Sequence, residues 1–296
     1  MGDRGGDGGD GGVEYLVEMI ALDNVTYTYP VTTTPALQNV SLTIPAGQFC
    51  AVVGANGAGK STLAYTLAGF VPHFYHGKLN GKVTVAGKDT AATPLSELVL
   101  DVGLVFQNPF NQISGAKFTV REEIAFGLEN LGVQRDEMLA RVEAAMRVVG
   151  IETLADRSPL ALSGGQMQRV AIASVLVMRP KAIVLDEPTS QLDPIGSREV
   201  FAAIRALAAE GSTVVMIEHK LEWVAAFADR VIAMAGGEVV ADGEPADVLT
   251  DESLLTRGLG QTRYTLAARR ARELGRWPAE RKLPVTLEEA VEGFRK

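Results

Sequence analysis

The chain has 296 residues, is 47% hydrophobic and carries a formal net charge of −8. This length permits one large core or two smaller ones, and the single cysteine, Cys50, excludes both a disulfide scaffold and a cysteine-based metal site. The negative charge argues against a nucleic-acid partner, because nucleic-acid binders usually carry a basic face, so we expect a globular protein of another class.

The amino terminus offers no targeting signal. Residues 1–12, MGDRGGDGGDGG, lack the apolar segment of a signal peptide and contain nothing to bury, so we expect them to be disordered. No apolar run elsewhere approaches the roughly 20 residues that a transmembrane helix needs. We therefore expect the chain to stay in the cytoplasm.

The first hundred residues read as a β-rich layer with one strand-loop-helix unit. The alternation in IALDNVTYTY and LQNVSLTI predicts two antiparallel strands around the turn-prone PVTTTP. A short apolar strand, QFCAVVG, follows and is expected to bury Cys50. KSTLAYTLAG then favours a helix, and KVTVAGK returns to a strand.

Roughly residues 108–175 form a helical insert in this interpretation. Thr119 and Glu122 have the spacing of a capping box at the start of one helix. A second run repeats apolar residues at helical spacing and stops at Gly150, and a third begins after Ser163, a candidate N-cap.

Strands and helices then alternate, which predicts a mainly parallel sheet covered on both faces. The strands are AIVLD, TVVMIEH and VIAMAGGEVVADG, and the helices between them are PIGSREVFAAIRALAAEG and KLEWVAAFADR. We expect one α/β domain over residues 13–250 and a helical tail over 251–296.

The stretch GANGAGKS fits the pattern G-x-x-x-x-G-K-S between a predicted strand and a predicted helix, as a phosphate-binding loop requires. Its glycines let backbone N–H groups point at phosphate oxygens, beside the positive end of the helix dipole. Lys60 adds a charge for the β and γ phosphates, and Ser61 offers a hydroxyl to Mg²⁺. The expected nucleotide-binding residues of this stretch are Gly54, Asn56, Gly57, Gly59, Lys60, Ser61 and Thr62.

The strand AIVLD delivers two carboxylates, Asp186 and Glu187, to its carboxyl end, where open α/β sheets bind ligands. Asp186 is the expected partner of the Mg²⁺ ion. Glu187 is then free to activate the attacking water as a general base.

A second anion site is predicted in LSGGQMQR. The Ser163 hydroxyl, bare glycine N–H groups and a helix N-terminus can all face phosphate oxygens. Since the chain already has one complete cradle, this second site is expected to serve the nucleotide of another chain. Its residues are Ser163, Gly164, Gly165 and Gln166.

From about Met19 to Asp251 these motifs resemble, in kind and order, the ATPase subunit of an ABC transporter. The resemblance implies a P-loop NTPase fold of the ABC ATPase type: a mainly parallel α/β core with an antiparallel β subdomain and a helical subdomain. It implies ATP and Mg²⁺ as cofactors and a head-to-tail dimer that sandwiches two ATP molecules.

The same resemblance assigns roles to four further residues. His219 in MIEHK is implied to contact the γ-phosphate, and Gln107 in VFQNP to sense both Mg²⁺ and the attacking water. Asp193 in SQLD is implied to communicate across the dimer. Tyr29 matches the aromatic residue that stacks on adenine, with Tyr27 on the same strand face as the competing candidate.

The stretch VFQNPFNQ and the ending LPVTLEEA are similar to the energy-coupling factor (ECF) group of ABC ATPases. The pattern of that group after the glutamine is x-P-D-x-Q; Asn108, Pro109, Asn111 and Gln112 fit it, whereas Phe110 replaces the usual aspartate. This likeness implies uptake of a vitamin or metal ion through a transmembrane T-component and a substrate-binding S-component, with the chain peripheral on the cytoplasmic face of the membrane and its tail helping the two ATPases to hold together.

Three choices remain open at this point. An efflux system is the alternative to an importer, whereas a DNA-repair or translation protein is disfavoured because the chain has neither a long coiled-coil insert nor a second cassette. The second ATPase is either the same chain or a related one. Basic residues gather between Arg257 and Lys282; they suggest a solvated helix face or, as the alternative, a dock for acidic lipids or an acidic partner.

Overall fold

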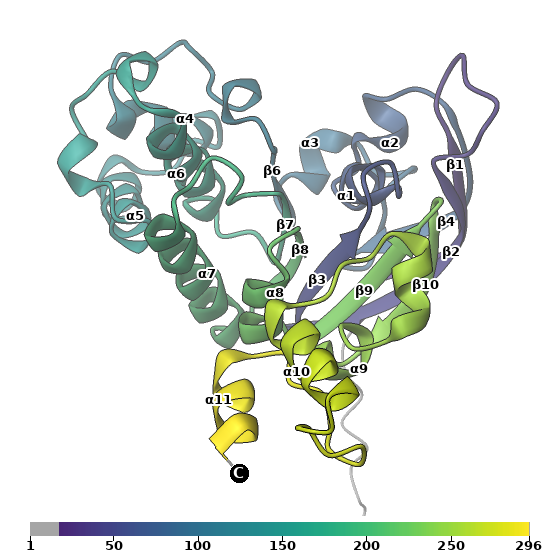
Figure 1. Cartoon of the computed structure of the whole chain (residues 1–296). Coiled ribbons are helices and arrows are strands. Elements are labelled where there is room, and N and C mark those ends of the chain that lie inside the picture. The colour runs from purple at the N-terminus through teal and green to yellow at the C-terminus, as the bar shows by residue number, and fades with distance from the viewer. Residues whose placement is uncertain (1–17, 296) are drawn as a thin grey trace, which may run out of the picture.

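The computed structural model describes residues 18–295. The expected disorder of residues 1–12 concerns a segment that lies outside this range. Figure 1 shows two lobes side by side, one rich in helices and one rich in strands, with the carboxyl-terminal helices below them. Within residues 18–295, no helix is both long and apolar enough to cross a membrane.

The smaller sheet is antiparallel and has the strand order β2-β1-β4-β5. The two strands expected around PVTTTP pair as predicted, with Leu22 opposite Leu42. Alternate residues of these strands are buried, which confirms the period-2 pattern. The strands are β1 (Glu18–Thr28), β2 (Leu37–Pro45), β4 (Lys78–Val85) and β5 (Lys88–Asp89).

The larger sheet has the order β10-β9-β3-β8-β7-β6 and is parallel except for β10, which runs antiparallel to β9. Because β3, β8 and β7 are neighbours, their carboxyl ends open on one edge of the sheet. The strands are β3 (Phe49–Gly54), β6 (Val102–Val105), β7 (Ala182–Asp186), β8 (Thr213–Ile217), β9 (Arg230–Ala235) and β10 (Glu238–Gly243).

Helix α1 (Lys60–Leu67) packs between the two sheets, with α2 (Phe70–His73) and α3 (Leu95–Leu98) beside it in Figure 1. The helical lobe holds α4 (Val120–Asn130), α5 (Arg135–Val148) and α6 (Gly164–Leu176). Both expected N-caps are present: the Thr119 and Ser163 side chains accept from the backbone N–H of Glu122 and Gln166, and each helix start has a complete capping box.

The remaining helices follow the larger sheet and continue into the tail. They are α7 (Pro194–Ala209), α8 (Leu221–Phe227), α9 (Pro245–Val248), α10 (Arg263–Glu273) and α11 (Leu287–Arg295). Short 3-10 turns lie at Pro109–Asn111, Glu152–Leu154, Pro159–Ala161 and Glu252–Arg257.

The larger sheet is buried on both faces, as its continuous apolar strands require. Cys50 and Val52 of β3 join the core that α1 shares with the smaller sheet. Phe49, on the opposite face, joins the core of the helical lobe. The expected burial of Cys50 is confirmed, and this burial raises the pKa of its thiol far above the ordinary value.

The basic stretch of the tail is not simply a solvated helix face. The Arg269 guanidinium donates to the Thr250 carbonyl and pairs with Glu252, and Arg263 pairs with Glu222 at 3.1 Å. The Arg281 guanidinium donates to the Gly293 carbonyl at 2.9 Å. Several of these arginines therefore hold the tail together, which residue counting cannot reveal.

Candidate functional site

The phosphate loop lies between β3 and α1, where the sequence predicts it. Gly54 has φ of 155° and Gly59 has φ of 98°. A Cβ atom at Gly54 would stand 2.3 Å from the Met234 carbonyl oxygen, and one at Gly59 would stand 2.6 Å from the Ala36 carbonyl oxygen. Only glycine fits these two positions, because both have a positive φ and a Cβ atom would collide with a backbone oxygen.

The loop encloses a cavity of about 470 Å³. This volume suits the triphosphate group of a nucleotide. Gln107 and Glu187, which follow two other strands, also line the cavity. The cavity is lined by Ala36, Asn56, Gly57, Ala58, Gly59, Lys60, Ser61, Thr62, Gln107 and Glu187.

Lys60 lies at the base of the loop, and the whole residue is only 6% exposed. It donates to the carbonyl oxygens of Gly54 at 2.8 Å and Ala55 at 3.0 Å. Burial lowers the pKa of Lys60, while the carboxylates of Glu187 and Asp186 act in the opposite direction. We propose that Lys60 meets the phosphate groups of the nucleotide at this place.

Asp186 has the properties of a metal ligand. Its Oδ1 atom is buried and has no hydrogen-bond partner among the described residues. Burial raises the pKa of this carboxyl, and a hydrogen bond from Ser61 only partly offsets the rise. Ser61, Gln107 and Asp186 offer the oxygen donors that Mg²⁺ prefers, and we propose them as its protein ligands.

No group of three or more His, Cys, Asp or Glu side chains within residues 18–295 has a metal-binding arrangement. Mg²⁺ usually takes one or two carboxylates and completes its shell with water and substrate phosphates. Bound there, the ion would neutralise charge on the phosphate oxygens.

The buried Asp186 carboxylate is expected to lower the stability of the fold while it supports ATP turnover. Since folding raises its pKa, its ionised form opposes folding, and the chain loses stability as the pH rises from the unfolded pKa through the folded one. Asp186→Asn is therefore expected to raise the free energy of unfolding at neutral pH and to lower ATP turnover. Denaturant titrations without nucleotide, at neutral and at mildly acidic pH, measure the effect.

Asp101 supplies the opposite control for this experiment. Burial acts against its charge, but the ammonium groups of Lys181 and Lys88, 2.8 and 2.7 Å away, hold its pKa below the usual range. Asp101→Asn is expected to destabilise the chain at neutral pH. A loss of stability in Asp186→Asn as well would contradict the account of Asp186.

Gln107, Glu187 and His219 meet although they follow the ends of three different strands, β6, β7 and β8. The Gln107 Nε2 atom donates to Glu187 Oε2 at 2.6 Å, and His219 Nε2 lies 2.8 Å from Glu187 Oε1. Glu187 is therefore engaged on both oxygens, by the two side chains that the sequence placed beside the γ-phosphate and the attacking water. Its φ of 48° is uncommon for a residue with a side chain and costs about 1–3 kcal/mol.

The two tyrosine candidates for the adenine contact differ in burial. Tyr27 is fully buried and its hydroxyl donates to the Tyr75 carbonyl at 3.0 Å, so it cannot reach a nucleotide. Tyr29 follows the end of β1 and is half-buried, and its hydroxyl lies 3.2 Å from Thr62 Oγ1 of the phosphate loop. The structure thus removes the competing candidate, and Tyr29 stays our proposal for the adenine contact.

The Ser163 motif forms a second, separate cavity of about 580 Å³ at the start of α6. It is lined by Ser163, Gly164, Gly165 and Gln166, together with Gly150, Ile151, Thr153, Leu154, Arg169, Gln191, Leu192 and Asp193. Asp193 also caps α7, because its Oδ1 atom accepts from the Gly196 N–H at 2.6 Å. The two cavities have no lining residue in common, so they are separate sites on this chain.

Several residues beside the site received no role from the sequence. Glu218 is 3% exposed and bonds to the backbone of His219 and to Thr189, while Lys220 bonds to the loop before α7. The sequence did offer one signal for these residues: a charged residue lies on each side of His219, Glu218 before it and Lys220 after it, at the end of an apolar strand.

Comparisons with known proteins agree with this geometry. The sequence model described as "ABC transporter" matches residues 37–190. A putative ABC transporter ATP-binding protein of Pyrococcus abyssi is 43% identical over 242 residues, which is 81% of this chain and 86% of that one.

Solved structures of ABC ATP-binding proteins also resemble this chain. The structure of cbiO1 from Clostridium perfringens, described as part of the ABC transporter complex cbiONQ, has a TM-score of 0.71 and 32% identity, covering 88% of this chain and 99% of that chain. The ATP-binding cassette MJ0796, solved as a dimer in a post-hydrolysis state with ADP and Pi, has a TM-score of 0.69 and 29% identity, covering 77% and 99%.

The fold is therefore the expected P-loop NTPase fold of the ABC ATPases, with a mainly parallel sheet, an antiparallel β part and a helical part. Since the family match takes in the phosphate loop, the Ser163 motif and both strand-end carboxylates, the chain belongs to the ABC transporter family, as an ATP-binding subunit that works as an ATPase.

Proposed function

We propose that the chain is the ATP-hydrolysing subunit of an ECF-type importer, which powers uptake of a vitamin or a metal ion. In this proposal it lies on the cytoplasmic face of the membrane, binds ATP and Mg²⁺, and works with a second ATPase subunit, a T-component and an S-component.

The single observation that carries the importer assignment is the extent of the similarity to cbiO1. That similarity covers 88% of the chain, more than residues 1–250 could supply, so it reaches into the tail. The MJ0796 cassette covers only 77% of the chain. A shared tail supports a shared kind of assembly, and cbiO1 is described as part of cbiONQ.

The loop after Gln107 supports contact with a membrane partner. Asn108 caps the 3-10 turn by accepting from the Phe110 N–H at 3.1 Å, which leaves the Phe110 ring 64% exposed. Gln112 faces inward: its Oε1 accepts from the Phe106 N–H at 3.2 Å and its Nε2 donates to the Ala171 carbonyl at 3.1 Å. The turn is therefore held in place by these hydrogen bonds while Phe110 stays exposed, and we propose that this ring contacts the membrane partner.

An apolar cavity of about 190 Å³ lies behind this loop. It is lined by Ala68, Phe70, Val99, Val102, Gly103, Leu104, Phe106, Ser174, Val175 and Met178, which come from both lobes. A partner that docks on the exposed Phe110 and in this cavity would contact both the ATP-binding core and α6. Movement of one lobe relative to the other would therefore change the contacts of such a partner.

The site performs hydrolysis with the residues described above. We propose that Lys60 and the loop N–H groups bind the phosphates, that Glu187 accepts a proton from the attacking water, and that His219 and Gln107 orient Glu187 and the γ-phosphate. The Ser163 motif then supplies the remaining donors from the partner subunit. Each ATP is held by two chains.

Co-purification tests the importer assignment. From detergent-solubilised membranes, the full chain is expected to carry a T-component homologue with it, and Phe110→Asp is expected to lower its recovery at least about tenfold through the cost of burying a charge. Leu139→Asp is the matched control, because Leu139 is 38% exposed on α5, outside both the loop after Gln107 and the tail. Recovery of a transmembrane export domain in place of a T-component would support the efflux alternative and overturn the proposal.

A further inference from the structure

A carboxylate is buried directly beside His219. Strand β8 ends at Ile217, and the next residue, Glu218, is 3% exposed. Burying a carboxylate is unfavourable unless several donors surround it. The contacts of Glu218 therefore indicate what its charge is used for.

Each oxygen of Glu218 holds a different segment. Oε2 accepts from the backbone N–H of His219 at 2.9 Å and from that of Lys220 at 3.2 Å. Oε1 accepts from the hydroxyl of Thr189, a fully buried side chain. Of the common side chains, a carboxylate is suited to accept from three donors at once, because it has two oxygens and about four lone-pair positions.

Thr189 belongs to the loop that joins Glu187 to Asp193. Its carbonyl oxygen accepts from the Leu192 N–H at 3.1 Å, which folds the loop back on itself before α7 begins. Through one side chain, Glu218 therefore ties the backbone of His219 to the loop that carries both the proposed base and the residue proposed to face the partner subunit.

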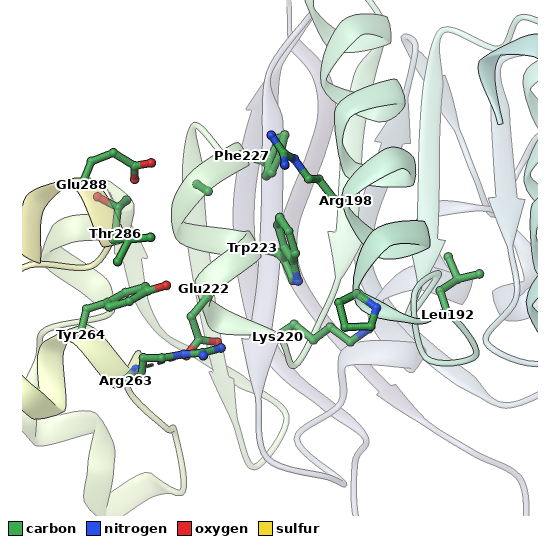
Figure 2. Close-up of a pocket in the computed structure, with 13 residues that line it drawn as sticks. Leu192, Arg198, Lys220, Glu222, Trp223, Phe227, Arg263, Tyr264, Thr286 and Glu288 are labelled. Carbon is green, nitrogen blue, oxygen red and sulfur yellow. Dashed lines mark hydrogen bonds and ion pairs between the residues drawn. The ribbon is translucent and has the colours of Figure 1, made fainter. Parts of the chain in front are cut away.

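Lys220 makes a second tie between the same two segments. Its Nζ atom donates to the Thr189 carbonyl oxygen and to Ser197 Oγ, both at 2.8 Å. Figure 2 shows its side chain extending from the start of α8 toward the loop that carries Leu192. Since Ser197 lies in the first turn of α7 and is fully buried, Lys220 fixes the loop from the far side of Asp193.

The tail reaches the same place from the other direction. A groove of about 730 Å³ lies between α7, α8 and the tail. Figure 2 shows its lining side chains, with Glu222 of α8 paired to Arg263 of α10. Lys220 and Leu192 both line this groove. The segment around His219 is thus held on one side by the loop before α7 and on the other by the tail.

We propose that Glu218 and Lys220 are positioning residues that fix His219 relative to the loop of Asp193. When a second subunit meets Asp193, the movement of this loop reaches the histidine through Thr189 and Glu218. This inference rests on the proposed roles of Glu187 and His219. Displacement of a reacting group by about 1 Å can cost on the order of 10²-fold in rate, so the two ties affect turnover directly.

Steady-state ATPase kinetics of the purified full chain test the proposal. Glu218→Ala is expected to lower kcat by about 10- to 100-fold, with KM for ATP unchanged, because the phosphate loop is not touched. Glu218→Gln is expected to recover to within about threefold of the parental kcat. Its amide oxygen still accepts from both backbone N–H groups, and the Thr189 hydroxyl can turn to accept from its NH₂ group.

Glu123 provides the matched control for a buried carboxylate. It is 4% exposed on α4 and accepts from the Ser114 N–H at 2.6 Å and from the Ser114 hydroxyl at 2.9 Å. Glu123→Ala is expected to lower thermal stability while the folded protein keeps its kcat. If Glu218→Ala keeps the parental kcat, or if Glu123→Ala loses as much, the positioning role is wrong.

Hydrogen exchange separates this inference from the proposed function. In the parental chain the amides of His219 and Lys220 are expected to be protected, and Glu218→Gln retains that protection. Glu218→Ala is expected to expose them together with residues 189–193, which Glu123→Ala does not. Loss of turnover in Glu187→Gln checks the proposed base independently. If exchange at residues 189–193 is unchanged in Glu218→Ala, the tie is overturned whether or not the chain hydrolyses ATP alone.

Discussion

Glu187→Gln is expected to lower ATP turnover by about 10²- to 10⁴-fold while ATP binding stays intact, the range attributed to a general base. The amide has the same shape and can keep its contacts with Gln107 and His219, but it cannot take a proton from water. The phosphate loop and Lys60 are unchanged, so binding is preserved. Phosphate release and equilibrium binding of a fluorescent ATP analogue measure the two effects separately.

Glu210→Gln is the control for this variant, because Glu210 is an exposed residue at the end of α7, away from both cavities. It is expected to keep the parental turnover. If Glu187→Gln hydrolyses ATP at the parental rate, the assignment of the base is wrong.

Ser163→Arg is expected to lower turnover on the order of 10²-fold or more, the loss seen when a donor to a reacting anion is removed. The arginine side chain would fill the second cavity, and it would remove the cap at the start of α6, which costs about 1 kcal/mol of stability. ATP binding to the phosphate loop of the same chain should persist, because the two cavities have no lining residue in common.

Ser158→Arg is a suitable control, since Ser158 is exposed, precedes a 3-10 turn and makes no side-chain cap hydrogen bond. ATPase assays and ATP-binding measurements on both variants test whether the second cavity serves the nucleotide of another chain. Loss of ATP binding in Ser163→Arg alone would mean that the second cavity serves its own chain, contrary to the proposal.

Local patterns predicted much of the fold and the residues that we propose for the site. The capping boxes at Thr119 and Ser163 depend on residues three positions apart, and the buried strands depend on short apolar runs, so both can be seen in the sequence. The implied roles of Glu187 and His219 placed both near the γ-phosphate, and the structure brings them into contact because the strands before them are parallel neighbours whose carboxyl ends share one edge.

Contacts between distant segments could not be predicted in the same way. Tyr27 and Tyr29 share a strand face by spacing, and only the end of β1 at Thr28 and the packing around it show that Tyr27 is enclosed. Counting charges in the tail could not show that Arg269 and Arg281 bind carbonyl oxygens of other segments. For the same reason, nothing in the sequence paired Glu218 with Thr189.

The central claim is that each ATP is held between two chains, and sedimentation of the Glu187→Gln variant with ATP and Mg²⁺ tests it most directly. Because this variant binds ATP without turning it over, the sandwich should accumulate. We expect an ATP-dependent dimer, formed either by the chain alone or with its cognate ATPase, that Ser163→Arg abolishes. A monomer that persists at saturating ATP, both alone and with the cognate ATPase, would contradict the account.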